Sequence, residues 1–300
     1  MATLIMAIGL PASGKSTFYK KEIEPQPYES VYVSSDAIRE EVFGDVNDQN
    51  HNNEVFNIMF KRAVEGLKAD KLVYYDATNI SRKRRMNFIK EVRAAVKDKD
   101  IFVSGVIFAP DIQTVMARNM ERERTVPAEV IKRMLYHFEV PAYAEGFNKI
   151  SVYEVGNGSL YGALDELRKV AHDNPHHSLS IGEHMDAAYE AYMHNARRKS
   201  LVVARALQFH DIGKGIVKQF KDARGRISPV AHYYCHENVG AYMYLSMSVR
   251  MESDLYVALL INHHMDHFKG EKYLERMKKI YGDIFMSDLE IVHKYDVAAH

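Results

Sequence analysis

The first residues that could do chemistry form the segment IGLPASGKSTF, residues 8–18. It has the pattern G-x-x-x-x-G-K-S, in which glycines let successive backbone N–H groups surround a phosphate. The lysine of this pattern can reach the β- and γ-phosphates of a nucleoside triphosphate, and the serine can ligate Mg²⁺. The segment therefore predicts a site for ATP, or another nucleoside triphosphate, with Mg²⁺. The expected contacts come from Gly9, Ala12, Ser13, Gly14, Lys15, Ser16 and Thr17, with Ser16 as the Mg²⁺ ligand.

Asp36 and Arg39, in VSSDAIRE, follow a second apolar run. In open α/β sheets, ligands bind at the carboxyl ends of the strands. A carboxylate at Asp36 can accept the proton of an acceptor hydroxyl, and an arginine one helical turn later can hold a neighbouring phosphate. Asp36 can also be the N-cap of the following helix, and the two roles are compatible.

The third apolar run ends in YYDATN, and two interpretations of its aspartate are open. Asp76 can orient Mg²⁺ or its waters, or it can belong to a strand-end turn with Thr78 and Asn79. Further along, Arg118 and Arg122 are spaced i,i+4 on an expected helix. Such arginines suit a lid that closes on a triphosphate, although arginines on a helix face are usually solvated charges.

Histidine is concentrated in the second half of the chain, where most of the fifteen follow residue 170. His210 and Asp211 stand together at an expected helix end, and an imidazole with a carboxylate suits Mn²⁺, Fe²⁺, Ni²⁺ or Zn²⁺. His184 and Asp296, on other helices, can complete the ligand set. His236, His263 and His264 are either ligands of a second metal or groups that hold a scissile phosphate. His176, His177 and His267 are expected at the surface or outside the ligand set.

Two kinds of elements must position these residues. Short apolar runs, rich in β-branched and aromatic residues, alternate with amphipathic stretches in the first half, which predicts a parallel sheet covered by helices on both faces. The runs span residues 3–10, 31–35, 71–77, 101–108 and 151–155. From about residue 180 the chain is expected to form only helices. We therefore expect an α/β domain over residues 1–157, a connector over 158–173 and an all-α domain over 174–300.

Composition restricts the partners. The formal net charge is zero, so any site for a polyanion must be a local patch. The single cysteine, Cys235, fits a reducing cytoplasm. The N-terminal run MATLIMAIGL is expected to be a buried strand rather than a signal peptide, and no apolar segment approaches the ~18 residues of a membrane span. We expect a cytoplasmic protein with no membrane partner.

The motifs of the first half together resemble the 5′-hydroxyl polynucleotide kinase family. GLPASGKST, SSDAIR, DATN and RNxxxR…VP carry the resemblance, which covers roughly residues 1–155. It implies that Lys15 and Ser16 bind the donor, that Asp36 is the general base on a 5′-OH, that Arg39 contacts the acceptor's phosphate, and that Arg118 and Arg122 are lid contacts to ATP. Kinases with a DATN motif also include small-molecule kinases and toxin kinases, so the acceptor stays open.

The second half is similar to the HD phosphohydrolase superfamily over roughly residues 173–300. HHSLSIGEH…FHDIGKG…HENVG resembles the HD domain of bacterial tRNA nucleotidyltransferases, which acts on 2′,3′-cyclic and 2′-phosphates. The resemblance implies an HD-type helical fold, metal ligands at His184, His210, Asp211 and Asp296, and Lys214 as a cation facing the phosphate. In such a site the metal lowers the pKa of bound water.

The two resemblances combine in one hypothesis: healing of nucleic-acid ends, RNA favoured over DNA, with an RNA ligase acting downstream. One alternative is a small-molecule or nucleoside kinase fused to a nucleotide phosphatase. Another is a nucleotide-sensing regulatory protein with an HD output domain. The oligomeric state, the native metal and the number of ions stay open.

Overall fold

The computed structural model describes residues 1–300 except 157, 176–177, 249–251 and 300. It forms two compact units, one made of Met1–Met134 and Pro141–Glu154, the other of Leu135–Val140 and Val155–His300. The segment 158–173, expected as a connector, contains helix α7 (Leu160–Leu167) and belongs to the second unit. The reason is its apolar face, because Leu160, Leu164 and Leu167 are buried.

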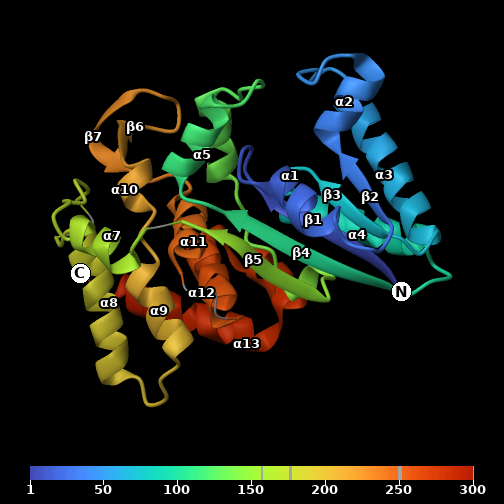
Figure 1. Ribbon diagram of the computed structural model, residues 1–300. Helices are drawn as coiled ribbons and strands as arrows, with labels where there is room; N and C mark the ends of the chain where they lie inside the picture. Colours follow the sequence, from blue (N-terminus) through green and yellow to red (C-terminus); the bar gives the residue numbers. More distant parts are fainter. Residues whose placement is uncertain (157, 176–177, 249–251, 300) are drawn as a thin grey trace. The chain divides into compact units, whose positions relative to one another are not determined.

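The first unit contains a five-stranded sheet in the order β2-β3-β1-β4-β5 (Figure 1). Strand β1 pairs in parallel with β3 and β4, and β2 pairs in parallel with β3. The five predicted strands are therefore confirmed, and so is the parallel pairing of β1 to β4. The strands are β1 (Ala2–Gly9), β2 (Ser30–Ser34), β3 (Leu72–Asp76), β4 (Ile101–Ala109) and β5 (Lys149–Val155).

Both faces of this sheet are covered, as the continuous apolar runs predict. Alternate residues of a strand point to opposite faces. On one face, Phe18 of α1 (Lys15–Phe18) lies 5.5 Å from the ring of Phe108, and η1 (Tyr19–Ile23) packs beside it. On the other face, α3 (Asn52–Lys68) packs on the strands, and α4 (Arg82–Ala95) places Phe88 4.2 Å from Tyr75.

A buried ion pair holds the turn after β3. Arg85 and Glu145 have completely buried side chains and form two hydrogen bonds of 2.7 Å. Arg85 also donates to the carbonyl of Asn79 at 3.0 Å, and the Asn79 amide donates to Ala7 O at 2.7 Å. The pair therefore ties the DATN turn to the strand that leads into the phosphate loop. The remaining helices of this part are α2 (Ser35–Phe43), α5 (Ile112–Met120), α6 (Ala128–Tyr136) and η2 (Tyr143–Glu145).

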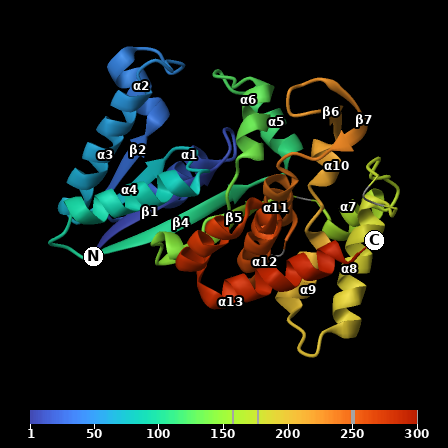
Figure 2. The ribbon, with the colours of Figure 1, turned by 180° about the vertical axis from the view of Figure 1, so that it is seen from behind.

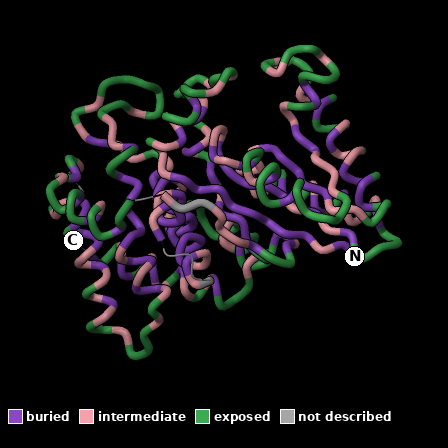
Figure 3. Tube along the Cα trace, viewed as in Figure 1, coloured by how far each residue is buried: buried purple, intermediate pink, exposed green. Residues whose placement is uncertain are grey.

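The second unit is mainly helical, as expected (Figures 1 and 2). Its helices after α7 are α8 (Ile181–Asn195), α9 (Leu201–Phe209), α10 (Lys214–Val217), α11 (His236–Met247), α12 (Glu252–His263), η3 (His264–Lys269) and α13 (Glu271–Val297). Helix α13 packs along α8, α9 and α12 and is kinked at Gly282, where φ is 81°. Figure 3 shows buried residues concentrated along these packed helices.

Residues 135–140 belong to this helical unit although they precede β5. The ring of Phe138 lies 5.2 Å from that of Tyr242, edge to face. The amide oxygen of Asn262 accepts a 2.9 Å hydrogen bond from the backbone N–H of Val140. These buried contacts hold the segment on α11 and α12.

The expectation of a purely helical second half is wrong in one segment. Strands β6 (Gln219–Lys221) and β7 (Ile227–His232) form an antiparallel hairpin, with Gly225 at φ 78° in its turn. The sequence does not reveal this hairpin, because β6 has only three residues and Pro229 interrupts the β-type pattern of β7. No helix among the described residues is long and apolar enough to cross a membrane.

Removing Glu145 should destabilise the first unit strongly. Glu145→Ala removes the carboxylate that neutralises the buried Arg85 guanidinium, which typically costs about 3–5 kcal/mol. Urea unfolding followed by circular dichroism should show the loss as a lower midpoint. Glu41→Ala is the matched control, because Glu41 forms a bidentate pair with Arg62 that is exposed to solvent. Equal midpoints for Glu145→Ala and Glu41→Ala would contradict the role of the buried pair.

Candidate functional sites

The phosphate loop lies between β1 and α1 in a conformation that suits an anion. Ala12 has φ 60° and Gly14 has φ 100°, both in the left-handed region. Backbone turns of this kind direct successive N–H groups into one concavity. A Cβ at Gly9 would lie 2.6 Å from the carbonyl oxygen of Phe108, so a larger residue does not fit there.

Lys15 and Asp76 face each other at the carboxyl edge of the sheet. Lys15 Nζ donates to the carbonyls of Leu10 at 2.7 Å and Gly9 at 3.2 Å. Burial lowers the pKa of Lys15, whereas the charge of Asp76 raises it. Burial raises the pKa of Asp76, which Lys15 and a 2.7 Å hydrogen bond from Tyr32 oppose. The pair can therefore attract both a phosphate and its Mg²⁺.

Asp36 is not the N-cap of α2, so that alternative is wrong. Helix α2 begins one residue earlier, and the hydroxyl of Ser34 accepts the capping hydrogen bond from Ala37 N at 3.4 Å. The Asp36 carboxylate, 42% exposed, is instead 2.5 Å from Arg124 and 3.8 Å from Arg122. Its oxygens are thus available for ionic contacts at the edge of the sheet.

The Arg39 side chain forms hydrogen bonds with other residues of the first unit. Its side chain is buried and donates to Asp48 O at 2.8 Å, Asn52 Oδ1 at 2.6 Å and Ser35 O at 3.2 Å. In this arrangement the guanidinium orders the loop between α2 and α3. Contact of Arg39 with an acceptor's phosphate stays a prediction.

The predicted i,i+4 pair of Arg118 and Arg122 on one helix is wrong. Helix α5 ends at Met120, because the side-chain amide of Asn119 bonds Val126 N at 3.0 Å and Val126 O at 2.8 Å and folds the following loop back. Arg122 therefore lies in this loop, whereas Arg118 lies on the helix.

Sequence reasoning missed Arg124. It reaches Asp36 from the same loop and also donates to Asn47 Oδ1 at 3.0 Å. Its only signal was its position two residues after Arg122. Two residues spaced i,i+2 point to the same side of an extended segment. On the helix expected here they would point to different sides.

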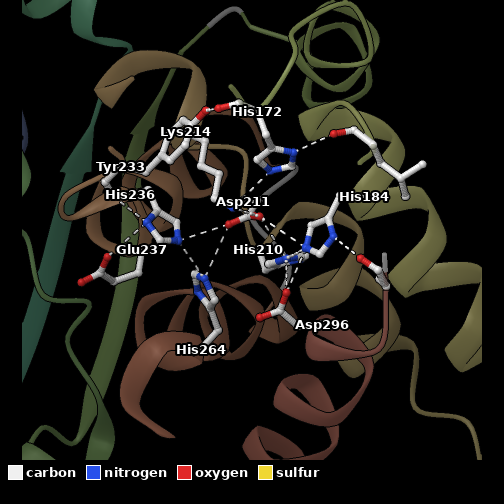
Figure 4. Close-up of polar contacts among 12 residues, drawn as sticks. His172, His184, His210, Asp211, Lys214, Tyr233, His236, Glu237, His264 and Asp296 are labelled. Atoms are coloured by element: carbon white, nitrogen blue, oxygen red, sulfur yellow. Dashed lines mark hydrogen bonds and ion pairs between the residues drawn. The ribbon is translucent and has the colours of Figure 1, made fainter. Parts of the chain in front are cut away.

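In the second unit, four histidines converge on two aspartates (Figure 4). Each histidine uses Nδ1 in a hydrogen bond to a backbone carbonyl: His184 to Ala299 (2.6 Å), His210 to Leu207 (2.7 Å), His236 to Tyr233 (2.7 Å) and His264 to Ile261 (2.7 Å). A carbonyl only accepts, so Nδ1 carries a proton. In the neutral ring, Nε2 then presents its lone pair to the centre, which is the usual arrangement of a metal-binding imidazole.

The converging atoms form two groups, one of His184, His210 and Asp296, the other of Asp211, His236 and His264. Within each group the ligand atoms lie within 4.8 Å of one another. The Nε2 atoms of His184 and His210 are 3.3 Å apart, and those of His236 and His264 are 3.1 Å apart. Two lone pairs at this separation repel each other unless a proton or a metal ion is shared between them.

Asp211 belongs to the second group and also contacts the first. Its Oδ1 is 3.2 Å from His236 Nε2, and its Oδ2 is 3.3 Å from His210 Nε2. Lys214 Nζ lies 2.6 Å from Oδ2 as an ion pair. Among the described residues, however, none donates a hydrogen bond of normal geometry to the buried Oδ2 of Asp211.

The electrostatics of this centre favour a cation. Burial lowers the pKa of His210, but Asp211 and Asp296 raise it more, to about 10. Burial raises the pKa of the Asp211 and Asp296 carboxyls. Nevertheless, Lys214 and His210 hold the pKa of Asp211 well below its usual range, and His210 does the same for Asp296. Imidazole and carboxylate ligands around an under-bonded carboxylate oxygen fit a divalent transition metal.

His263 lies outside both groups, which speaks against the first of its two expected roles, that of a ligand of a second metal. Its Nδ1 contacts Asp266 Oδ2 at 2.7 Å, and its Nε2 contacts the Tyr281 hydroxyl at 3.2 Å. Consecutive residues on a helical segment point in different directions, so His264 turns inward and His263 outward. His267 stacks on His293 at 4.4 Å, outside the ligand set as expected. His176 and His177 lie outside the described residues.

A second residue that sequence reasoning missed is His172. It is 2% exposed, bonds Leu179 O through Nδ1 at 2.9 Å and lies 3.3 Å from Lys214 Nζ through Nε2. Burial lowers its pKa to about 4, so the ring is neutral near pH 7 and accepts from the lysine. Lys214 is thus held between His172 and Asp211. Its position in AHDNPHH does not distinguish it from its neighbours.

Comparisons with known proteins agree with a phosphate-loop domain in the first unit. Residues 4–141 match a family model described as an AAA domain. The L-seryl-tRNA(Sec) kinase of Methanococcus maripaludis is 29% identical over 197 residues, which cover 60% of this chain and 69% of that protein. With its parallel sheet and phosphate loop, the first unit is an α/β domain with a P-loop, similar over residues 4–141 to AAA domains.

Two solved structures show weaker similarity. One, the Pnkp1/Rnl/Hen1 RNA repair complex, matches at a TM-score of 0.38 and 20% identity, covering 45% of this chain and 43% of that chain. The other, a fungal RNA kinase, matches at a TM-score of 0.40 and 12% identity, covering 56% of this chain and 44% of that chain. The present chain therefore spans less than half of either matched chain.

Lys15→Ala should weaken binding of Mg-ATP by about tenfold or more, because it removes the cation that meets the β- and γ-phosphates. Isothermal titration calorimetry with Mg-ATP measures the loss. Lys20→Ala, an exposed lysine just after α1, is the matched control and should bind like the wild type. Unchanged affinity in Lys15→Ala would show that the loop does not hold a triphosphate in this way.

Proposed function

We propose that this chain heals broken nucleic-acid ends, with RNA preferred over DNA. In the proposal, the first unit transfers a phosphoryl group from ATP to a 5′-OH end. The second unit, an HD-type domain with Mn²⁺, Fe²⁺, Ni²⁺ or Zn²⁺, hydrolyses a 2′,3′-cyclic phosphate or a terminal 2′- or 3′-phosphate. The observation that carries the second activity is the Asp211 carboxylate, which is shared between two groups of inward-facing imidazoles.

In the kinase reaction Asp36 is the proton acceptor. The acceptor hydroxyl gives its proton to the Asp36 carboxylate while its oxygen attacks the γ-phosphorus, and the bond to the β-phosphate oxygen breaks to release ADP. Lys15 holds the donor phosphates. Arg118 and Arg122 offset the charge on the transferring group. Arg124 occupies Oδ1 of Asp36, so Oδ2 is the oxygen that accepts the proton.

In the hydrolase reaction the chain supplies ligands and a cation. His184, His210 and Asp296 would hold one ion with one oxygen of Asp211, and His236 and His264 would meet the other oxygen. A bound divalent ion there supplies an activated water and polarises the phosphoryl oxygen. Lys214, oriented by the neutral ring of His172, would offset charge on the scissile phosphate.

The two activities are chemically complementary. Metal-independent cleavage of RNA, in which the 2′-OH attacks its own phosphodiester, leaves a 2′,3′-cyclic phosphate on one fragment and a 5′-OH on the other. An RNA ligase that joins a 3′-OH to a 5′-phosphate can use neither end. We therefore propose such a ligase as the downstream partner.

A second candidate for the kinase half is transfer to a hydroxyl that is attached to RNA but is not its 5′ end. The similarity to an L-seryl-tRNA(Sec) kinase favours it. An assay with labelled ATP and two acceptors, a 5′-OH RNA oligonucleotide and seryl-tRNA, separates the two. Label on seryl-tRNA alone would overturn the proposed end-healing function.

Asp36→Asn should lower 5′-OH phosphorylation by roughly 10²-fold or more while Mg-ATP binding stays close to wild type, as expected for loss of a general base. Single-turnover assays and calorimetry measure the two effects. Glu40→Gln, on the same helix and exposed, removes the same charge and should keep full activity. Transfer within a few-fold of wild type in Asp36→Asn would place the base elsewhere.

Asp211→Ala should abolish hydrolysis of a 2′,3′-cyclic phosphate and lower the metal content of the protein, because both groups lose a shared ligand. Kinase activity should stay within about threefold, since separate sites usually behave additively. The measurements are metal analysis by mass spectrometry and both activities on one preparation. Asp283→Ala, an exposed aspartate of the second unit, is the control. If folded Asp211→Ala protein loses kinase activity together with hydrolase activity, the proposal of two separate sites is wrong.

A further inference from the structure

The β6–β7 hairpin begins and ends beside the candidate metal centre. Lys214, on α10, lies just before β6, and Tyr233, whose ring lies 5.3 Å from the Lys214 ammonium, follows β7. His236, one of the imidazoles of the centre, comes three residues after Tyr233 (Figure 4). Both ends of the hairpin are therefore anchored at residues of the site.

The hairpin exposes large apolar and aromatic side chains. Ile227 is 89% exposed, Phe220 is 46% exposed and Tyr234 is 38% exposed. The rings of His232 and Tyr234 stack at 5.5 Å with only 6° between their planes. A ribbon of two short strands is marginally stable alone, and these side chains do not contribute to the core. The aromatic side chains of Phe220 and Tyr234 are therefore partly exposed to solvent.

The same segment is locally basic in a protein whose formal net charge is zero. Residues 218–234 contain four lysines or arginines and a single acidic residue, Asp222. Asp222 accepts hydrogen bonds from the side chain of Arg226 at 2.7 Å and from the backbone N–H of Arg224 at 2.9 Å. Lys218 pairs with Asp173 at 2.7 Å. Within the described residues, the exposed side chains of Lys221 and Arg224 form no ion pair.

We propose that this hairpin binds the single-stranded RNA segment that precedes the terminal phosphate at the metal centre. The proposal rests on the proposed hydrolase function and specifies its substrate, an oligonucleotide rather than a free cyclic mononucleotide. Aromatic side chains that accept stacked bases, together with cations that meet the backbone, are the general means of binding single strands. From Tyr233 to Ile227 the ribbon extends roughly 20 Å at ~3.3 Å per residue, enough for several nucleotides.

The test compares two substrates that share one reacting group: 2′,3′-cyclic AMP and a ten-nucleotide RNA that ends in a 2′,3′-cyclic phosphate. In the double variant Lys221→Ala, Arg224→Ala, kcat/KM for the RNA should fall about tenfold or more. Hydrolysis of cyclic AMP should stay within about twofold, which also shows that the variant is folded. The slope of log KM against log salt for the RNA should decrease by about 1.4, because two phosphate contacts are lost.

The matched control is Arg198→Ala, Lys199→Ala, which removes the same charge from the exposed loop between α8 and α9. His184 lies near the start of α8 and His210 just after the end of α9, so this loop is at the other end of both helices, about 16 Å away along α8. Equal losses in the hairpin variant and in this control would overturn the proposal. Unchanged hydrolysis of both substrates by the hairpin variant would overturn it as well.

Failure of the proposed function gives a different result. If the wild-type protein hydrolyses neither substrate, the hydrolase assignment falls, and fluorescence anisotropy with a labelled single-stranded RNA then decides the hairpin proposal. Weaker RNA binding by Lys221→Ala, Arg224→Ala than by the wild type and the loop control would support it. Equal binding by all three proteins would overturn it.

Discussion

The second unit depends on one buried negative charge, the carboxylate of Asp211. It is 1% exposed, and an isolated charge at such a depth would be strongly destabilising. Lys214 and His210 lie beside it in its own α9–α10 segment, His236 comes from the start of α11, and His264 comes from the end of α12. The α9–α10 segment, the start of α11 and the end of α12 therefore have to meet at this point. The packing of the unit and the chemistry of the site have the same electrostatic origin.

Backbone carbonyls near helix ends make this meeting precise. Two of the four inward-facing histidines directly follow a helix and donate Nδ1–H to the carbonyl three residues earlier, His210 to Leu207 after α9 and His264 to Ile261 after α12. Carbonyls in the last turn of a helix lack partners within it. An imidazole placed just after that turn satisfies such a carbonyl and is fixed in one tautomer at the same time. The ends of α9 and α12 thus fix the orientation and the tautomer of the imidazoles of His210 and His264.

Much of this arrangement could be predicted from the sequence, because it follows from local patterns. The strands were visible as apolar runs, and the phosphate loop and the His210–Asp211 pair had fixed spacings. Long-range contacts were not visible. Arg124 reaches Asp36 only because Asn119 ends α5 early. His172 acts through Lys214, 42 residues away, and no local period encodes such a contact. His263 and His264 are chemically identical, and only the end of α12 decides which of them turns inward.

The segment 135–140 has a consequence for synthesis of the chain on the ribosome. Its Val140 N–H bonds Asn262, which is 122 residues further along. At about 5–20 residues per second, roughly 6 to 24 seconds pass between the synthesis of these two residues. During that time Phe138, completely buried in the finished protein, lacks its partners. The first unit can close its sheet soon after residue 154 is made, so it must fold with an apolar loop still exposed to the cell. Chaperones and proteases therefore have a defined interval in which this protein, although half folded, carries a recognisable hydrophobic segment.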